Sequence, residues 1–259
     1  MASKVKPGIC RDGIMTAPFY KKMFVEDKTW STPWPNFDEA RRWAVLLPWL
    51  ADICYERYRQ DLKPPKILDV GCGRGWMTRL ASVFGECAGV DPIQEVIQYA
   101  REIHPGIKFN ALTPAKLLRE PAFQPYDVVL CSEVLEHVPY SGQSQFVKDL
   151  VRLVHRGGYL LVTTPRGKWR RKWNRLGFAG QPVEDWLDEK DAKRLFQDAG
   201  GSAVRYDRVY ISLPRLSFLH RLCVSRKFGK ILKIIHGEVL RASLEYMSGF
   251  YQAWCFIRL

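Results

Sequence analysis

The sequence predicts an α/β protein built on a mostly parallel sheet, and three observations support this prediction. Apolar strand-like runs alternate with amphipathic helical stretches between residues 66 and 165, which implies parallel strands joined by crossover helices. A glycine-rich turn directly follows the first run, as in open sheets that bind ligands at their strand ends. The chain has 259 residues, of which 47% are hydrophobic, enough for one large domain with additions.

The first part of the chain, residues 1–60, is rich in aromatic residues and leads into a helix. Asn36 is a suitable N-cap, with Asp38 and Glu39 in the first helical turn. Because proline lacks an N–H group, we expect Pro48 to kink this helix or to begin a second one.

Strands and helices then alternate in regular order. Strands are predicted at 66–71, 86–91, 107–110, 126–132 and 157–165, and helices at 75–84, 93–103 and 142–155. A helix at 187–201 precedes a sixth strand at 202–213, and residues 249–259 are typical of a last strand. The alternation leaves residues 214–248 unexplained, and we interpret them as an insertion.

The glycine loop "KILDVGCGRGW" (66–76) indicates a ligand site. A strand, a glycine turn and a helix N-terminus together present free N–H groups, and Gly71, Gly73 and Gly75 would let a ligand lie against the chain. Asp91 ends the next strand, where a carboxylate can accept both hydroxyls of a ribose. Loop and acid together predict a nucleoside-type ligand.

Spacing helps to separate two such ligands, a dinucleotide and S-adenosylmethionine. The dinucleotide pattern G-x-G-x-x-G needs a third glycine where this chain has Trp76. Asp69 would repel a pyrophosphate but suits the cationic amino group of a methionine moiety. S-adenosylmethionine therefore fits better.

Four segments, "ILDVGCGRGWMTRLA", "GVDPIQEVIQYAR", "YDVVLCSEVLEHVP" and "GGYLLVTTP", resemble class I S-adenosylmethionine-dependent methyltransferases in order and spacing. The likeness is to the ubiquinone-biosynthesis O-methyltransferase and methyltransferase type 11 group, over roughly residues 60–212. It implies a Rossmann-like sheet of seven strands in the order 3-2-1-4-5-7-6, flanked by helices, with the last strand antiparallel.

The resemblance also implies cofactor contacts. It places the methionine moiety beside Asp69, Gly71, Cys72, Gly73 and Gly75, the ribose on Asp91, and the adenine beside Pro92 and Ile93; we also assign Glu133 to the cofactor. Such proteins often carry an acid near the adenine amino group after the third strand. This chain has none there, so we expect a backbone contact from Ala111 or Leu112 instead.

His137 follows the fourth strand and is our candidate catalytic base, because imidazole titrates near neutral pH. A purely structural histidine is the alternative. Glu133, Glu136 and His137 also form E-x-x-E-H, which is similar to the metal-binding segment of related enzymes, and could hold Mg²⁺. The same letters occur in such methyltransferases without a metal, and we assign no metal ligand.

Two basic segments could contact the methyl acceptor. "RGKWRRKW" (166–173) could bind an anionic group and stack Trp169 and Trp173 on a ring, or form a solvated loop with one tryptophan packed beneath. In the 214–248 insertion, apolar residues with helical spacing lie opposite basic ones. Such a helix can lie on anionic lipid, cover the sheet or close over the acceptor.

Composition limits the cellular setting. The net charge of +13 would suit nucleic acid, anionic lipid or an acidic substrate. Seven cysteines without a C-x-x-C pair indicate neither a disulfide framework nor a zinc cluster. We found no secretion signal or membrane span, and expect a cytoplasmic protein, with contact to the inner face of a membrane left open.

These observations predict a methyltransferase domain at 61–259, preceded by an acceptor lid at 1–60. We expect S-adenosylmethionine-dependent O-methylation of a small or amphiphilic acceptor, such as a quinol, phenol, sugar or glycolipid hydroxyl, including a lipid-linked one. The alternatives are an RNA-directed 2′-O-methyltransferase, for which nucleic acid is the less favoured partner, and a catalytically silent protein that keeps the cofactor fold.

Overall fold

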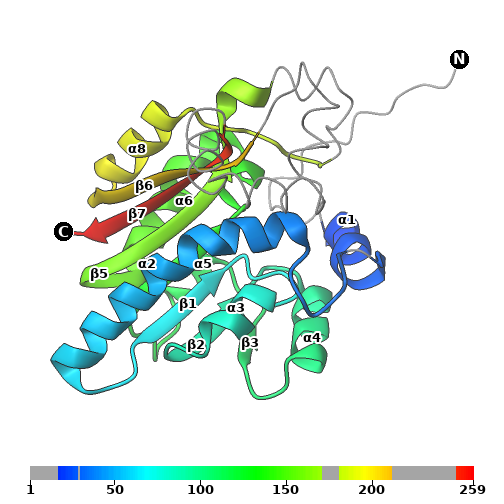
Figure 1. The fold of residues 1–259 in the computed structure, drawn as a ribbon. Coiled ribbons are helices and arrows are strands. Elements are labelled where there is room, and N and C mark those ends of the chain that lie inside the picture. Colours follow the sequence, from blue (N-terminus) through cyan, green and yellow to red (C-terminus); the bar gives the residue numbers. More distant parts are fainter. Residues whose placement is uncertain (1–16, 29, 171–180, 212–248) are drawn as a thin grey trace, which may run out of the picture.

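The computed structural model describes residues 17–28, 30–170, 181–211 and 249–259, and these form a three-layer α/β structure (Figure 1). The sheet order is β3-β2-β1-β4-β5-β7-β6. The strands are β1 (Lys66–Val70), β2 (Glu86–Val90), β3 (Lys108–Asn110), β4 (Tyr126–Ser132), β5 (Val154–Pro165), β6 (Gly201–Ile211) and β7 (Gly249–Arg258). Strands β1 to β5 pair in parallel, and β7 is antiparallel to both β5 and β6. The predicted fold class and strand order are confirmed.

Helices cover both faces of the sheet, because alternate strand residues point to opposite faces. The helices are α1 (Ala17–Lys21), α2 (Phe37–Asp61), α3 (Trp76–Ala81), α4 (Gln94–Ile103), α5 (Pro114–Leu117), α6 (Tyr140–Leu153) and α8 (Glu189–Asp198), with short turns η2 (Lys22–Glu26), η3 (Leu135–His137) and η4 (Gly167–Trp169). Helices α2 and α3 pack on the face that carries Ile67, Val128, Leu130, Leu161 and Cys255. Helices α5, α6 and α8 pack on the opposite face, which carries Leu68, Val129, Cys131, Leu160 and Val162.

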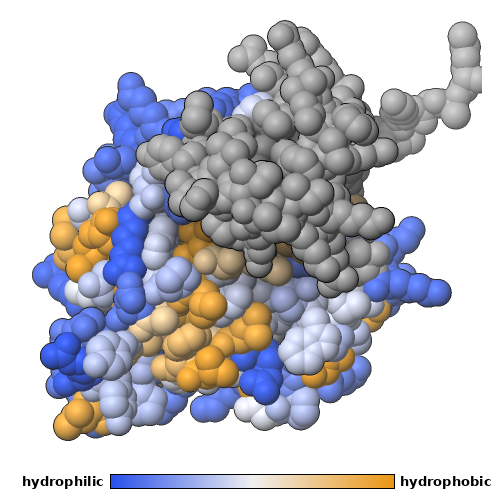
Figure 2. Space-filling view, viewed as in Figure 1, coloured by the Kyte–Doolittle hydropathy of each residue, from blue (hydrophilic) through white to orange (hydrophobic). Residues whose placement is uncertain are grey.

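The long helix α2 crosses the front of the sheet and connects the N-terminal segment to β1 (Figure 1). Asn36 caps it as predicted: its side chain accepts from the Glu39 N–H at 3.0 Å, and the Glu39 carboxylate accepts from the Asn36 N–H at 2.8 Å. Pro48 lies inside this single helix, so no second helix begins there. On this side of the molecule, apolar residues gather over α2 and α3 (Figure 2), where Leu47 and Leu80 pack partly buried against the core.

Element boundaries differ from the predictions by a few residues. The loop expected after β3 contains the short helix α5, which the Thr113 side chain caps and which Pro114 begins. Strand β5 begins at Val154, three residues earlier than predicted. The predicted basic helix in 214–248, Trp173 and residues 1–16 lie outside the described residues. Within the described part, no helix combines the length and apolar character needed to cross a bilayer.

Candidate functional site

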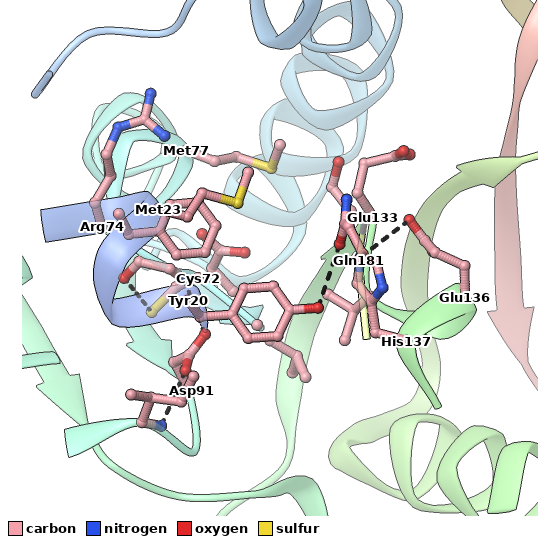
Figure 3. Close-up of a pocket in the computed structure, with 18 of the residues that line it drawn as sticks. Tyr20, Met23, Cys72, Arg74, Met77, Asp91, Glu133, Glu136, His137 and Gln181 are labelled. Carbon is pink, nitrogen blue, oxygen red and sulfur yellow. Dashed lines mark hydrogen bonds and ion pairs between the residues drawn. The ribbon is translucent and has the colours of Figure 1, made fainter. Parts of the chain in front are cut away.

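A cavity of about 920 Å³ opens at the carboxyl ends of β1, β2 and β4 (Figure 3). This is where ligands bind in open α/β sheets. In the close-up, Cys72, Met77 and Asp91 lie on one side and Glu133, Glu136 and His137 on the other, with Tyr20 reaching between them (Figure 3). The cavity thus brings together the glycine loop and the segment after β4, as the sequence predicted.

The glycine loop lies under this cavity. Gly71, Cys72 and Gly73 line it, whereas Gly75 does not and instead begins α3. Gly71 has φ of 71°, and a Cβ atom there would lie 2.3 Å from Val134 Cγ2. Packing against Val134 thus requires glycine at this position, whether or not a ligand also approaches it.

Two buried carboxylates lie on the cofactor side. Asp91 accepts hydrogen bonds from the N–H groups of Gly73 at 3.2 Å and Ile93 at 3.0 Å. Asp69 accepts one from the Thr78 hydroxyl at 2.7 Å. Burial raises the pKa of Asp91 to about 6 and that of Asp69 to about 7. Both carboxylates line the cavity and could accept hydrogen bonds from ribose hydroxyls or an ammonium group.

The adenine end agrees only in part with the prediction. Pro92, Ile93 and Leu112 line the cavity, but Ala111 does not; it packs instead against the cluster around Phe109. The Leu112 N–H already donates to the Asn110 carbonyl at 3.0 Å. A contact from this segment to an adenine amino group would therefore use a carbonyl oxygen.

An acid pair follows β4. Glu133, whose φ is 58°, accepts from the Thr163 hydroxyl at 2.9 Å, and Glu136 accepts from Thr164 at 2.9 Å. Burial raises the pKa of Glu133 to about 8 and that of Glu136 to about 7, and for Glu133 the nearby charge of Glu136 adds to the rise. One proton shared by the pair is therefore expected near neutral pH.

These side chains do not form a metal site. Among the described residues, no group of three or more His, Cys, Asp or Glu side chains is placed to hold a metal ion. The Mg²⁺ that E-x-x-E-H could have held therefore has no role in the reaction steps considered below.

His137 presents a free ring nitrogen. Its Nδ1 lies 2.9 Å from the Val183 carbonyl oxygen, which can only accept, so Nδ1 carries a proton. Burial lowers the pKa of His137 below its usual value. The neutral ring therefore has an unprotonated Nε2, which lies 3.8 Å from Glu136 Oε1. This is the form that can accept a proton from a substrate.

Arg42 is a site residue that the sequence analysis missed. It lines the cavity, is 6% exposed, and its Nε has no hydrogen-bond partner among the described residues. Its Nε lies 4.0 Å from Glu133 Oε1, and its guanidinium lies over the Tyr251 ring at 4.8 Å. Burial lowers its pKa, but Glu133 and the other neighbouring acids more than compensate and raise it. Arg42 is thus a buried cation able to bind a carboxylate.

An N-terminal wall, which we define as residues 17–28 and 30–36, covers the glycine loop. The Tyr20 hydroxyl donates to Gln181 Oε1 at 3.3 Å, and its ring meets the His137 ring edge-on at 5.8 Å (Figure 3). Phe24 lies 3.4 Å from the position of a Cβ on Gly73. The short helices that carry these aromatics, α1 and η2, gave no strong pattern in the sequence.

Trp169, in the basic aromatic loop, does not lie where the sequence analysis expected it to meet an acceptor. Trp169 is buried in a cluster with Trp186 and Phe250 and does not line the cavity. Its indole N–H donates to the Gly249 carbonyl at 2.9 Å. The expected stacking of Trp169 on an acceptor is therefore wrong, because the start of β7 occupies its face and its N–H.

Comparison with known proteins agrees with this geometry. A family model described as "Methyltransferase domain" matches residues 40–213, more than half of the chain. A ubiquinone biosynthesis O-methyltransferase from Rickettsia conorii is 33% identical over 132 residues, 49% of this chain and 43% of that protein. One from Proteus mirabilis is 36% identical over 103 residues, 38% and 41% of the two chains. The match spans less than half the length of these curated relatives.

Solved structures share the fold at low identity. The N-methyltransferase NodS from Bradyrhizobium japonicum, solved with S-adenosylhomocysteine, has a TM-score of 0.61 and 14% identity, covering 94% of this chain and 98% of its own. Magnesium protoporphyrin IX methyltransferase from Synechocystis, solved with S-adenosylmethionine, has a TM-score of 0.56 and 14% identity, covering 97% and 99%. The chain belongs to the methyltransferase family that the sequence motifs indicated.

Proposed function

We propose that this methyltransferase transfers the methyl group of S-adenosylmethionine to a hydroxyl of a small or amphiphilic acceptor. The observation that carries the proposal is the unprotonated Nε2 of His137, which lines the same cavity as the glycine loop. A hydroxyl must lose its proton when it is methylated, and this nitrogen is the group best placed to receive it.

The charged side chains of the cavity support the choice of S-adenosylmethionine as the cofactor. S-adenosylmethionine carries ribose hydroxyls, an ammonium group and a carboxylate, and the cavity offers a complement for each. Asp91 would accept the ribose hydroxyls, Asp69 would face the ammonium group, and Arg42 would pair with the carboxylate. Pro92 and Ile93 would flank the adenine.

Because the cofactor would carry an already activated methyl group, the protein mainly has to align the acceptor oxygen with it. Once bound, S-adenosylmethionine would supply an activated methyl group to an acceptor oxygen held in line with its carbon–sulfur bond, and would leave as S-adenosylhomocysteine. The hydroxyl proton passes to His137 Nε2, and Glu136 Oε1, 3.8 Å away, stabilises the imidazolium that forms. The Nδ1 bond to the Val183 carbonyl would hold the ring in the same orientation before and after this proton transfer.

The lining of the acceptor side supports an aromatic or amphiphilic molecule. Aromatic side chains dominate it: Phe19, Tyr20, Trp186, Phe250 and Tyr251. Rings of this kind suit a quinol or phenol, or the apolar part of a lipid-linked acceptor. The relatives named as ubiquinone biosynthesis O-methyltransferases agree with this choice. Contact with an anionic membrane would deliver such an acceptor, and we propose it as part of the same function.

The RNA-directed alternative receives less support. Although the whole chain carries a net charge of +13, the described residues that line the cavity include eight Asp or Glu and three Lys or Arg. An acidic cavity repels a phosphate backbone.

The cysteines Cys54, Cys72, Cys87, Cys131 and Cys255 are unpaired in the described part, which fits the reducing cytoplasm that we propose as the location of this protein.

The first test is calorimetric titration with S-adenosylhomocysteine, with NAD as the control ligand and Asp91→Ala as the control protein. We expect micromolar binding that Asp91→Ala abolishes, and no binding of NAD. A screen with labelled methyl donor against phenols, quinols and lipid extracts, with RNA in parallel, would then find the acceptor. Failure of the wild-type protein to bind S-adenosylhomocysteine would favour the catalytically silent alternative.

A further inference from the structure

Arg74 lies inside the glycine loop among the residues that line the cavity, and its guanidinium extends away from Tyr20 and Asp91 (Figure 3). The guanidinium is 1% exposed and forms a bidentate ion pair with Glu39, with N–O distances of 2.8 and 2.7 Å. It also donates to the carbonyl oxygens of Thr32 at 2.5 Å and Trp34 at 3.1 Å. All of these partners belong to the N-terminal wall or to the first turn of α2.

Glu39 serves two partners at once. It accepts from the Asn36 N–H at 2.8 Å, which completes the cap of α2, while it pairs with Arg74. The point where the wall enters α2 is thus fixed to the loop that would hold the cofactor. Charge-assisted bidentate pairs of this kind have a strongly preferred geometry, especially when buried.

Among the described residues, the first part of the wall packs on the rest of the chain through partly exposed side chains. Helix α1 and η2 contain no buried residue. Outside Arg74, the described polar contacts to the rest of the chain include Tyr99 hydroxyl to Ser31 carbonyl at 2.6 Å and Tyr20 to Gln181 at 3.3 Å. A segment with little buried apolar area is expected to open locally at low free-energy cost. Its position over the cavity therefore depends strongly on the few bonds that hold it.

We infer that Arg74 is a positioning residue that couples the glycine loop to the N-terminal wall, so that a ligand on the loop orders the wall that closes the acceptor side. The inference rests on the proposed function. Phe24 packs directly on Gly73 and both residues line the cavity, so a ligand there would contact both elements. Arg74 holds the glycine loop and the N-terminal wall in the relative position in which the Tyr20 ring contacts the His137 ring.

The test compares amide hydrogen exchange of residues 17–36 in the full-length protein, with and without S-adenosylhomocysteine. The variants are Arg74→Gln and Glu39→Gln; glutamine at position 39 can still cap α2 but carries no charge. The matched control is Arg79→Gln, because Arg79 is exposed and its described side-chain bond is a 3.4 Å contact with Ser82. Exchange of β1 and β4 reports the stability of the core.

We expect S-adenosylhomocysteine to slow exchange of the wall in the wild type and in Arg79→Gln. In Arg74→Gln and Glu39→Gln, wall exchange should rise by about 10- to 100-fold, the factor that loss of such charge-assisted bonds is worth, without a matching change in the core. Ligand binding should persist while its protection of the wall is lost.

Three results would be decisive. If the ligand binds but wall exchange in Arg74→Gln equals that of the wild type, the coupling inference is wrong. If wall and core exchange rise together, Arg74 merely stabilises the fold and the inference is also wrong. If the wild type binds no ligand, the proposed function itself fails, while the difference in wall exchange between unliganded variants still tests the attachment.

Discussion

Replacement of Arg42 by glutamine gives the sharpest test of how the cavity would hold the methionine end of the cofactor. Glutamine keeps a hydrogen-bond donor of similar reach but removes the charge. Because Arg42 is 6% exposed, a ligand carboxylate about 4 Å away would gain about 4 kcal/mol of Coulomb energy at an effective dielectric constant of 20. Desolvation of the carboxylate offsets part of this gain, so a net loss of about 2–3 kcal/mol is expected, or about 30- to 150-fold in affinity.

The assay is a comparison of two ligands by titration calorimetry. S-adenosylhomocysteine should bind the wild type about 30- to 150-fold more tightly than its decarboxylated analogue, and this preference should vanish in Arg42→Gln. Arg59→Gln on the same helix is the matched control, since the Arg59 side chain is 61% exposed, pairs with Glu56 at 3.3 Å and lies over the Tyr55 ring at 5.8 Å, away from the cavity. An equal loss of affinity for both ligands, or a preference that survives in Arg42→Gln, would refute the assignment of Arg42 to the carboxylate.

Four further outcomes follow from the site. His137→Gln should lower turnover by roughly 10²-fold while S-adenosylhomocysteine affinity is kept, and near-normal turnover would rule out its role as base. Affinity for S-adenosylhomocysteine should rise between pH 5.5 and 7.5, and binding should release protons, because Asp91 and Asp69 ionise with pKa values of about 6 and 7. Calorimetry in buffers of different ionisation enthalpy measures the number of protons released. An affinity that does not change with pH would contradict this prediction. The unliganded protein should lose stability over the same pH range, since these carboxyls bind protons in the folded state that the unfolded chain has released, and urea titration checks the sign. Gly71→Ala should destabilise the fold by about 2–5 kcal/mol, because alanine there would have a positive φ and would clash with Val134. Gly106→Ala should destabilise it by only about 1–2 kcal/mol, because its Cβ would meet nothing within 4 Å. Equal urea midpoints for the two variants would contradict this difference.

The fold, and the meeting of the glycine loop and Asp91 at one cavity, could be predicted because their information is local. Strand, turn and acid follow one another within residues 66–91, and parallel pairing brings the ends of β1 and β2 together. The position of β7 between β5 and β6 came from a family resemblance and was confirmed by the register of Leu161 with Cys255. Gly75 and Ala111 show the limit of this reasoning. Both belong to segments that reach the cavity, yet neither lines it, because each packs beside Phe109 instead.

Arg42 and Trp169 could not be placed from local pattern, for opposite reasons. An arginine on an amphipathic helix normally lies in solvent, and only the approach of Glu133 and Tyr251 from other elements makes Arg42 a buried cation. A tryptophan between charges indicates a binding loop, but the Gly249 carbonyl takes up the N–H of Trp169. In both cases a partner far along the chain decides the role of the residue.

The same physical distinction separates the two halves of the cavity. The cofactor side uses backbone groups and carboxylates fixed at the ends of paired strands, so a change there disturbs the sheet itself. The acceptor side is assembled from separate segments, the N-terminal wall, residues 181–186 and the start of β7, that meet through side chains such as Tyr20 and Gln181. Those side chains can change with little cost to the sheet, so acceptor specificity is free to vary on one cofactor scaffold. The acceptor is therefore the property that the glycine loop cannot reveal, and substitutions at Tyr20 and Trp186 are where a change of acceptor should be sought.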